Sequence, residues 1–291
     1  MIEIYNNITQ NLNSGNIVAG IYLDIKKAFD SVDHDILLSK LDHYGIRGLP
    51  NLWFKNYLSN RKQFTFCNGH SSTLSNISSG VPQGSVLGPL LFLLYTNDMP
   101  FSINTKSHLN LFADDTSTFL AETNPEKLKT LITSTLVNIN SWLIANKLVL
   151  NTEKNMLHHI YTKKNKKMPD SLNYIQLGTT KIHRVKSAKL LGVTIDEDLS
   201  FKDHVDNLHL SLLKTGNAFK MIRSKISYEH KFMFYYAYFY SKIQYGIEIY
   251  GNASASTLDK IQKQQNRCRK ILFKKTFLLP LIYYTRILAS S

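Results

Sequence analysis

Two adjacent aspartates, Asp114 and Asp115, lie inside an apolar segment, and this pair constrains the chain more than any other feature. A third aspartate, Asp24, ends another apolar segment that begins at Ile17. Placing adjacent carboxylates in an apolar segment is costly unless a cation neutralises them. Mg²⁺ is such a cation, because it takes oxygen ligands and keeps positions open for phosphate oxygens. The pattern predicts a magnesium site; for the pair taken alone, a solvated Asp-Asp turn is the alternative.

The segments around these aspartates predict strands. Residues 17–23 form a short apolar run that delivers Asp24 at its end, and residues 108–120 predict a hairpin with the aspartate pair at its turn. Two metal ions held about 3.5–4 Å apart stabilise both the attacking and the leaving oxygen of a phosphoryl displacement. The three carboxylates therefore favour phosphoryl-transfer chemistry.

Other segments carry local signals of helices and turns. We expect a helix at residues 35–44 closed by Gly45, and a polar hairpin at residues 63–76 that turns at Asn68 and Gly69. A glycine-rich loop at residues 82–88 precedes a buried helix, and Asn124 with Pro125 begins another helix. Later in the chain we expect short strands at residues 181–199 and helices at residues 201–226 and 228–245, the second with most of its aromatic side chains in the core.

Positive charge is concentrated in the second half of the chain. The chain has 35 Lys and Arg against 21 Asp and Glu, a net charge of +14. Residues 1–150 hold 11 of each sign, so the remaining 24 basic and 10 acidic residues of 151–291 carry the whole excess. A basic surface is typical of proteins that bind phosphate backbones, although excess lysine can also serve solubility alone.

Several classes of protein are excluded by the sequence. The two cysteines, Cys67 and Cys268, are isolated, so the chain has neither a disulfide framework nor a zinc-site spacing. The start lacks the pattern of a signal peptide, and no apolar run approaches the roughly 20 residues of a membrane span. We expect an intracellular protein of the nucleus or the cytoplasm, or both, with no membrane contact.

Five segments, taken in order, match motifs of one polymerase family. Residues 23–34 read Leu-Asp-Ile-Lys-Lys-Ala-Phe-Asp-Ser-Val-Asp-His and look like motif A. Residues 80–90, which begin Gly-Val-Pro-Gln-Gly-Ser, look like motif B, and Phe-Ala-Asp-Asp at residues 112–115 looks like motif C. Residues 150–154 are similar to motif D, and residues 190–196 to the hairpin that grips the primer. Together they resemble the reverse transcriptase domain of non-LTR retrotransposons, the jockey-like and LINE-like elements, over about residues 10–273.

The resemblance implies an α+β fold, the right-hand palm of polymerases followed by a thumb. The palm, an antiparallel sheet with helices on one face and partial fingers, is expected over residues 1–180. The primer-grip hairpin and a mainly helical thumb are expected over residues 181–291. Compared with this family, the chain is expected to lack the N-terminal fingers and to be truncated at its C-terminus after Phe273.

The resemblance also assigns metal ligands. It implies that Asp24, Asp114 and Asp115, with the backbone carbonyl of Ile25, bind two Mg²⁺ ions, for which Mn²⁺ can substitute. Asp30 and Asp33 are expected to cap helices and to form local hydrogen bonds. Lys154 matches the motif D lysine, which in related polymerases protonates the pyrophosphate leaving group; an exposed structural lysine is the alternative.

The remaining assignments concern the nucleotide and the primer. Phe29 is implied to be an aromatic gate that excludes a 2′-hydroxyl, and an ordinary core phenylalanine is the alternative. Gln83 and Gly84 are implied to contact the nucleotide and the template base, where a simple turn before a helix is the alternative. Leu191 and Gly192 fit the primer grip, and their apolar neighbours also fit plain strand packing.

The resemblance implies an enzyme, an RNA-directed DNA polymerase that transfers a nucleotide from a dNTP to a primer 3′-hydroxyl. Its expected partners are an RNA template, a DNA primer and dNTPs, with no obligate protein partner. Two alternatives stay open. One is a degenerate fragment of a mobile element that binds nucleic acid without polymerising, and the other is a protein like the group II intron maturases.

Overall fold

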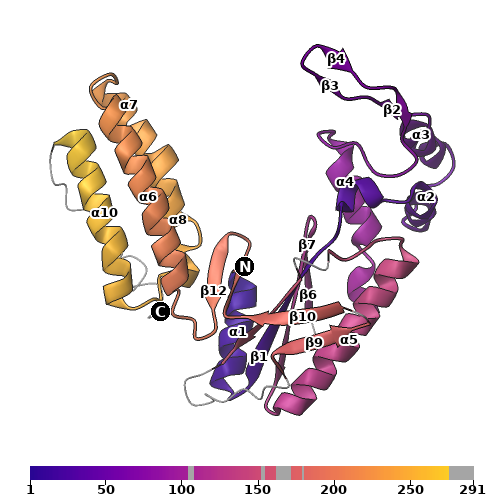
Figure 1. Ribbon diagram of the computed structural model, residues 1–291, viewed down its shortest axis with the longest axis horizontal. Coiled ribbons are helices and arrows are strands. Elements are labelled where there is room, and N and C mark those ends of the chain that lie inside the picture. Colours follow the sequence, from indigo (N-terminus) through magenta and orange to yellow (C-terminus); the bar gives the residue numbers. More distant parts are fainter. Residues whose placement is uncertain (104–107, 152–154, 162–171, 179, 275–291) are drawn as a thin grey trace. The chain divides into compact units, whose positions relative to one another are not determined.

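The computed structural model describes residues 1–103, 108–151, 155–161, 172–178 and 180–274 (Figure 1). The chain divides into two compact units. The sheet unit comprises Asn16–His158 and Lys167–Arg184. The helical unit comprises Met1–Gly15, His159–Lys166 and Val185–Ser291. Its first residues therefore belong with the C-terminal part of the chain.

A six-stranded sheet organises the sheet unit, in the order β6-β7-β1-β8-β10-β9. The strands are β1 (Ile17–Asp24), β6 (His108–Phe112), β7 (Asp115–Glu122), β8 (Met156–Ile160), β9 (Tyr174–Leu177) and β10 (Thr180–Val185). β1 pairs antiparallel with β7, from Ile17 opposite Glu122 to Asp24 opposite Asp115. Every residue of β1 before Asp24 is buried, which explains its nearly continuous apolar sequence.

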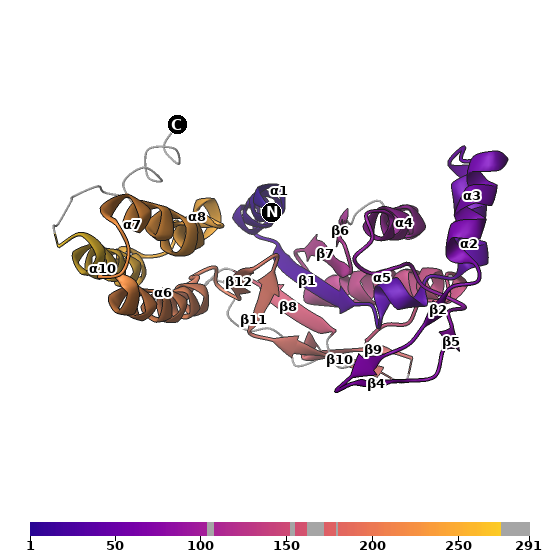
Figure 2. The ribbon, with the colours of Figure 1, turned by 90° about the horizontal axis from the view of Figure 1, so that it is seen from above.

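Helix α5 (Pro125–Ala145) packs against the sheet, where it contacts β1, β7 and β9 (Figure 2). The Asn124 side chain caps its first turn by accepting hydrogen bonds from the backbone N–H groups of Glu126 and Lys127. Its buried side chains recur at helical spacing and include Leu128, Ile132, Ile139 and Leu143. The predicted start of this helix is thus confirmed.

The described part of the sheet unit also contains the α-helices α2 (His34–His43), α3 (Leu49–Leu58) and α4 (Leu87–Thr96). As predicted, the segment between α3 and α4 is a hairpin, built from β2 (Lys62–Gln63) with β5 (Ser75–Asn76) and β3 (Phe66–Cys67) with β4 (His70–Ser71). Its tip residues Asn68 and Gly69 have φ values of 50° and 81°, which suits the preference of Asn-Gly for tight hairpin turns.

The helical unit contains a short hairpin and a group of packed helices. The hairpin joins β11 (Ser187–Leu190) to β12 (Val193–Asp196), and helix α1 (Ile2–Asn13) contacts α9 (Ile247–Tyr250). The longer helices α6 (Lys202–Ile222) and α10 (Ala255–Phe273) pack on each other. Between them in the sequence lie α7 (Tyr228–Phe234), a π-helical segment η4 (Tyr235–Tyr240) and α8 (Ser241–Gln244).

The π-helical segment corrects one expectation. Tyr235 and Phe239 are buried, but Tyr236 and Tyr238 are 51% and 58% exposed, and Phe232 is 40% exposed. Most aromatic side chains of this helix were expected in the core. A π turn bonds residue i to i+5, so side chains beyond it no longer follow α-helical spacing.

None of the helices in the described residues combines the length and the apolar composition that crossing a membrane requires.

Tyr95 of α4 ties three parts of the sheet unit together. The side chain is fully buried, and its hydroxyl donates to the backbone carbonyl of Asn146 at 2.7 Å. The same hydroxyl accepts from the backbone N–H of Asp33 at 3.4 Å, next to the start of α2. Burial raises the pKa of Tyr95 to about 12, so the hydroxyl keeps its proton. The end of α5 and the start of α2 are therefore held to α4.

We predict that Tyr95→Phe destabilises the chain by about 1–3 kcal/mol, because the buried Asn146 carbonyl loses this donor. The free energy of unfolding, measured by urea denaturation with circular dichroism, checks this. Tyr174→Phe is the matched control, since Tyr174 lies in β9 and is 44% exposed. Equal effects of the two substitutions would contradict the role of the Tyr95 hydroxyl.

Candidate active site

The register of β1 against β7 places two of the three predicted aspartates opposite each other in the sheet. Asp24 ends β1 directly opposite Asp115, the first residue of β7. Asp114 lies in the turn before β7, after Ala113, whose φ of 53° is in the left-handed region. The predicted turn thus contains Asp114 but not Asp115, which pairs with Phe112 in the β6–β7 ladder. An alanine at positive φ is strained, a feature that concentrates at functional sites.

Two asparagines hold Asp24 in place. The Asn151 side-chain amide donates to Asp24 Oδ2 at 2.8 Å, and the Asn151 backbone N–H donates to the Asp24 carbonyl at 2.8 Å. The backbone N–H of Asp24 donates to Oδ1 of Asn155, which is buried, at 3.1 Å. The sequence prediction missed both asparagines. Asn151 lies inside the segment similar to motif D, which is the signal that could have found it.

Ile25, the residue after Asp24, forms an isolated antiparallel β-bridge with Leu150. The two hydrogen bonds of this bridge join Lys26 to Val149 and Asn151 to Asp24. The Ile25 carbonyl therefore takes no part in the bridge, which is compatible with its predicted role as a metal ligand. Lys154, the predicted proton donor, lies outside the described residues.

The ligand atoms around Asp24 are of the kind that binds a hard cation. Asp24 and Asp114 are half-buried, Asp115 is exposed, and the donor set consists of carboxylate and carbonyl oxygens, which Mg²⁺ prefers. Among the described residues, no three His, Cys, Asp or Glu side chains gather as a metal-binding group. The strand pairing therefore aligns the backbones of Asp24 and Asp115, while the three carboxylates are not gathered into one metal-binding group.

Phe29 lies in the short helix η1 (Ala28–Ser31), five residues after Asp24. Its ring is half-buried and packs against the fully buried ring of Phe92 in α4, with the centroids 4.7 Å apart. The phenyl group is thus supported on one side and partly exposed. Because a supported aromatic ring has few alternative positions, Phe29 offers a rigid surface beside the strand that ends at Asp24.

The loop before α4 is joined to η1 through backbone hydrogen bonds. The N–H of Gly80 donates to the carbonyl of Val32 at 2.7 Å, and the N–H of Val81 donates to the carbonyl of Phe29 at 2.8 Å. One ring nitrogen of His34 lies 2.8 Å from the Gly80 carbonyl oxygen. We call this set of contacts the η1–loop joint, and it holds the two motif-like segments together.

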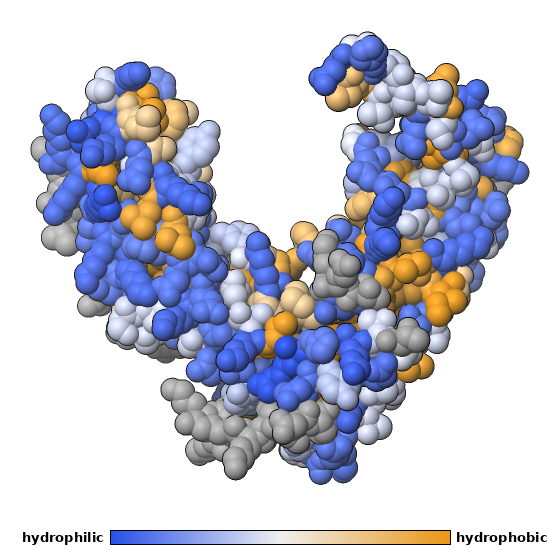
Figure 3. Space-filling view, viewed as in Figure 1, coloured by the Kyte–Doolittle hydropathy of each residue, from blue (hydrophilic) through white to orange (hydrophobic). Residues whose placement is uncertain are grey.

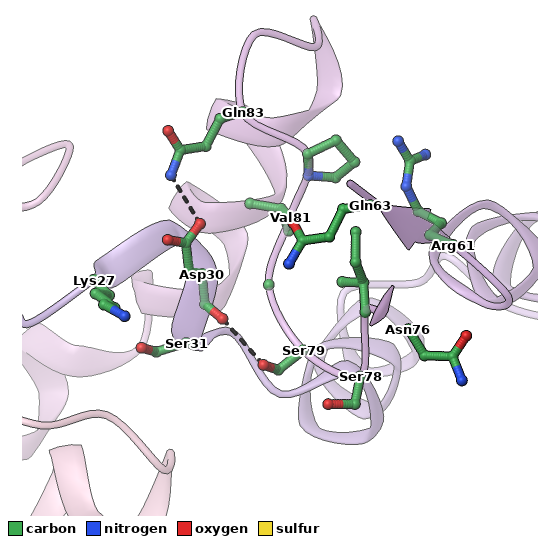
Figure 4. A pocket seen from close by; sticks show the side chains of 13 residues that line it. Lys27, Asp30, Ser31, Arg61, Gln63, Asn76, Ser78, Ser79, Val81 and Gln83 are labelled. Atoms are coloured by element: carbon green, nitrogen blue, oxygen red, sulfur yellow. Dashed lines mark hydrogen bonds between the residues drawn. The ribbon is translucent and has the colours of Figure 1, made fainter. Parts of the chain in front are cut away.

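Asp30 adds side-chain contacts to the η1–loop joint. The Gln83 amide donates to Asp30 Oδ1 at 2.8 Å, and the Ser79 hydroxyl donates to the Asp30 carbonyl at 3.1 Å (Figure 4). Asp33, by contrast, caps α2 as predicted, by accepting from the backbone N–H groups of Asp35 and Ile36. The expectation that Asp30 caps a helix was wrong, because its carboxylate binds the Gln83 amide instead.

A polar cavity of about 580 Å³ opens at the η1–loop joint. Lys27, Arg61 and Gln63 line it together with Asp30 and Gln83, as Figure 4 shows. Gly84, the next residue along the chain, has a φ of 80° and open space where a Cβ would lie. This positive φ requires the conformational freedom of glycine, and the chain turns at residues 83–84.

The predicted primer-grip residues form a tight turn within the helical unit. Leu191 and Gly192 connect β11 to β12 and have φ values of 45° and 89°. Positive φ at both positions is what a two-residue type I′ hairpin turn requires. The Tyr245 hydroxyl donates a hydrogen bond to the Leu191 carbonyl, so the turn is held against the end of α8.

A family model matches most of the chain. Residues 6–195 match the family model described as reverse transcriptase (RNA-dependent DNA polymerase). The match covers more than half of the chain, and the chain therefore belongs to the reverse transcriptase family.

Its homologues include polymerases of non-LTR retrotransposons. The probable RNA-directed DNA polymerase from transposon X-element of Drosophila melanogaster is 31% identical over 261 residues, which is 87% of this chain and 28% of that protein. The RNA-directed DNA polymerase from mobile element jockey of the same species is 27% identical over 277 residues, 89% of this chain and 29% of that protein. The chain thus spans less than a third of the length of these relatives.

A solved structure matches more distantly. Telomerase from Candida albicans, in complex with a fragment of telomeric RNA, aligns with 98% of this chain and 54% of its own chain, at 11% identity and a TM-score of 0.49. The fold class is α+β with an antiparallel sheet, as predicted.

We predict that Gly80→Ala opens the η1–loop joint. A Cβ at Gly80 would lie 2.8 Å from both the Cα and the carbonyl oxygen of Asp30, so backbone atoms must move. Gly69→Ala is the control, because Gly69 has a similar φ of 81° and nothing within 4 Å of the added Cβ. The free energy of unfolding should fall by about 1–3 kcal/mol more for Gly80→Ala than for Gly69→Ala. Equal losses in urea denaturation would mean that φ strain alone acts at both sites.

Proposed function

We propose that this chain forms the catalytic core of an RNA-directed DNA polymerase of a non-LTR retrotransposon. It would join a dNTP to the 3′-hydroxyl of a DNA primer paired with an RNA template. The observation that carries the proposal is the register of β1 and β7. It aligns Asp24 with Asp115, and Asp114 is the residue directly before Asp115. Membership of the reverse transcriptase family supports it.

In the proposed reaction the primer 3′-oxygen attacks the α-phosphorus of the dNTP. A new phosphorus–oxygen bond forms, the bond from the α-phosphorus to its bridging oxygen breaks, pyrophosphate leaves, and the hydroxyl proton passes to solvent. Asp24, Asp114 and Asp115, with the Ile25 carbonyl, would hold two Mg²⁺ or Mn²⁺ ions. When bound, such ions supply charge stabilisation to the attacking and leaving oxygens. Asn151 and Asn155 would keep Asp24 at the strand end.

The residues of the η1–loop joint would select the nucleotide. Phe29, backed by Phe92, would present a rigid ring against which a ribose 2′-hydroxyl clashes. Gln83, oriented by Asp30, and Gly84 would contact the nucleotide and the template base. Selection by a clash works only when the ring cannot retreat, and its packing on a buried side chain meets this condition.

The helical unit is proposed to bind the template and primer, with its hairpin turn at Leu191 and Gly192 as the primer grip. Residues 151–291 hold 24 basic and 10 acidic residues. The face of this unit seen in Figure 3 is predominantly hydrophilic. A surface rich in basic residues attracts phosphate backbones without regard to sequence. On this proposal residues 1–180 act as the palm and residues 181–291 as the thumb.

The same charge distribution supports a second candidate, a nucleic-acid-binding fragment without polymerase activity. Basic residues account for binding and not for catalysis, so the two candidates differ only in whether primers are extended. The mobile-element polymerases named above favour the retrotransposon proposal over a maturase.

We predict that Asp114→Asn abolishes extension of a DNA primer on an RNA template and leaves primer–template binding nearly unchanged. The substitution removes one negative charge from the proposed ion ligands and keeps the side-chain size. Extension is measured with dNTPs and Mg²⁺, binding by fluorescence anisotropy, and bound Mn²⁺ by electron paramagnetic resonance. Asp42→Asn is the control, since Asp42 is an exposed aspartate of α2.

Three outcomes separate the candidates. Extension and Mn²⁺ binding that are lost only in Asp114→Asn support the polymerase. Duplex binding by the wild type without any extension supports the binding fragment. Parallel loss of duplex binding and extension in Asp114→Asn would show that this aspartate acts in folding rather than in catalysis.

We predict that Phe29→Val raises the incorporation of ribonucleotides relative to deoxyribonucleotides, because the clashing ring is removed. The ratio of the two kcat/KM values for extension checks this. Phe101→Val is the control, since Phe101 is 87% exposed. An unchanged ratio with activity retained would show that Phe29 has only a packing role.

A further inference from the structure

A group of aromatic side chains lies partly exposed where α7 meets the end of α10. The two helices contact each other and lie side by side in the helical unit (Figure 2). We call the group the α7 aromatic cluster, and its members are Tyr228, Phe232, Tyr235, Tyr236 and Phe273. Three of them expose much of their rings to solvent: Tyr228 is 55% exposed, Phe232 40% and Tyr236 51%. Apolar ring surface in this amount, gathered in one place, indicates a site of contact.

Ring contacts make the α7 aromatic cluster continuous. The centroid of the Phe273 ring lies 4.5 Å from that of Phe232 and 5.9 Å from that of Tyr228. The buried ring of Tyr235 lies 6.3 Å from Phe273 and 5.3 Å from Tyr236. Aromatic rings in such contacts attract each other beyond the area that they bury. The exposed rings are therefore held together as one surface.

The last residue of α10 is itself a member of the cluster. Phe273 ends the helix, and Lys274 has a φ of 58°, in the left-handed region that commonly terminates helices. The chain therefore leaves the axis of α10 beside the rings that Phe273 contacts. Four extended residues reach at most about 14 Å. Positions 228 and 236 are about 12 Å apart along a helix, so residue 277 can reach any part of the cluster.

The sequence that follows matches this surface in chemistry. Residues 277–284, which lie outside the described residues, read Phe-Leu-Leu-Pro-Leu-Ile-Tyr-Tyr and contain no charge. They also lie beyond residue 273, where the resemblance to the polymerase family ends. The cluster offers uncharged rings and no cation of its own, so it lacks what attracts a phosphate backbone. Tyrosine rings can cover apolar atoms while their hydroxyl groups stay in water.

We propose that the α7 aromatic cluster binds residues 277–284 of the same chain. The driving force is the removal of apolar surface of the segment and of the exposed rings from water. Residues 274–276 alone join the segment to Phe273. A tether this short gives an effective concentration on the order of millimolar, which favours the segment over a second copy of the chain. The proposal does not rest on the polymerase function.

The test uses the full chain with the photo-crosslinking residue p-benzoylphenylalanine in place of Tyr236. Irradiation should join position 236 to the tryptic peptide of residues 276–286 of the same chain, as identified by mass spectrometry. Position 238 is the matched control. Tyr238 is 58% exposed in the same π-helical segment, but its ring packs on Phe234, outside the cluster. From position 238 we expect no crosslink to this peptide.

Charged substitutions separate a defined site from chance encounters of a tethered segment. Leu278→Asp combined with Leu281→Asp should lower the crosslink yield from position 236 by about tenfold or more, because exposing even one buried leucine shifts an equilibrium by that much. Ala289→Asp is the control, since it adds a charge outside the apolar run. Without the crosslinker, amide hydrogen exchange of α7 should be faster in the leucine variant than in Ala289→Asp. Circular dichroism establishes that each variant is folded.

Several outcomes would overturn the proposal. Equal yields from positions 236 and 238, or equal yields in the leucine and alanine variants, would show contact without a defined site. Crosslinks between two chains would assign the cluster to a second copy. Crosslinks to an added RNA–DNA duplex, with loss of the product within the chain, would assign it to nucleic acid. If no crosslink forms, hydrogen exchange decides, and equal exchange of α7 in the two variants overturns the proposal. None of these measurements involves primer extension, so their result is independent of the polymerase function.

Discussion

The antiparallel register of β1 and β7 is the constraint on which the candidate active site depends. Side chains alternate between faces along a strand, so a slip of one residue would move Asp24 away from Asp115 and exchange the side chains that β1 packs on its two buried faces. Because every residue of β1 before Asp24 is buried, the core itself fixes this register. The hydrophobic residues thus position the carboxylates, although none of them has a chemical role.

Much of this arrangement follows from local sequence. The apolar run of β1, the Asn124–Pro125 helix start and the Asn68–Gly69 turn are decided by neighbouring residues, so the sequence predicted them. The aspartates stand out because placing carboxylates beside an apolar strand costs free energy unless their charge is compensated. Their number and order were predictable for this reason, but their placement was less so, since Asp115 lies in the strand and only Asp114 in the turn.

Features that depend on distant contacts were not predictable in the same way. Asn151 and Asn155 hold Asp24 from more than 120 positions away in the chain, and only the position of Asn151 in the segment similar to motif D indicates a role for either. Asp30 reads as a helix cap, yet its partner is Gln83, in a segment brought close by the backbone bonds of Val32 and Gly80. The π-helical segment likewise reads as an ordinary aromatic helix, because its widened turn leaves no signature in composition.

The η1–loop joint shows why residues for nucleotide selection can lie in two separate motifs and still act together. Backbone groups of Phe29 and Val81 bond directly, so any displacement of the loop that carries Gln83 also displaces the segment that carries Phe29. Gly80 permits this closeness, since a side chain there would meet the backbone of Asp30. The backbone bonds of the joint therefore require one particular glycine, and the side chains of His34 and Asp30 add to them. The backbone brings residues 29 and 83 together, and the bond from Asp30 orients the Gln83 amide.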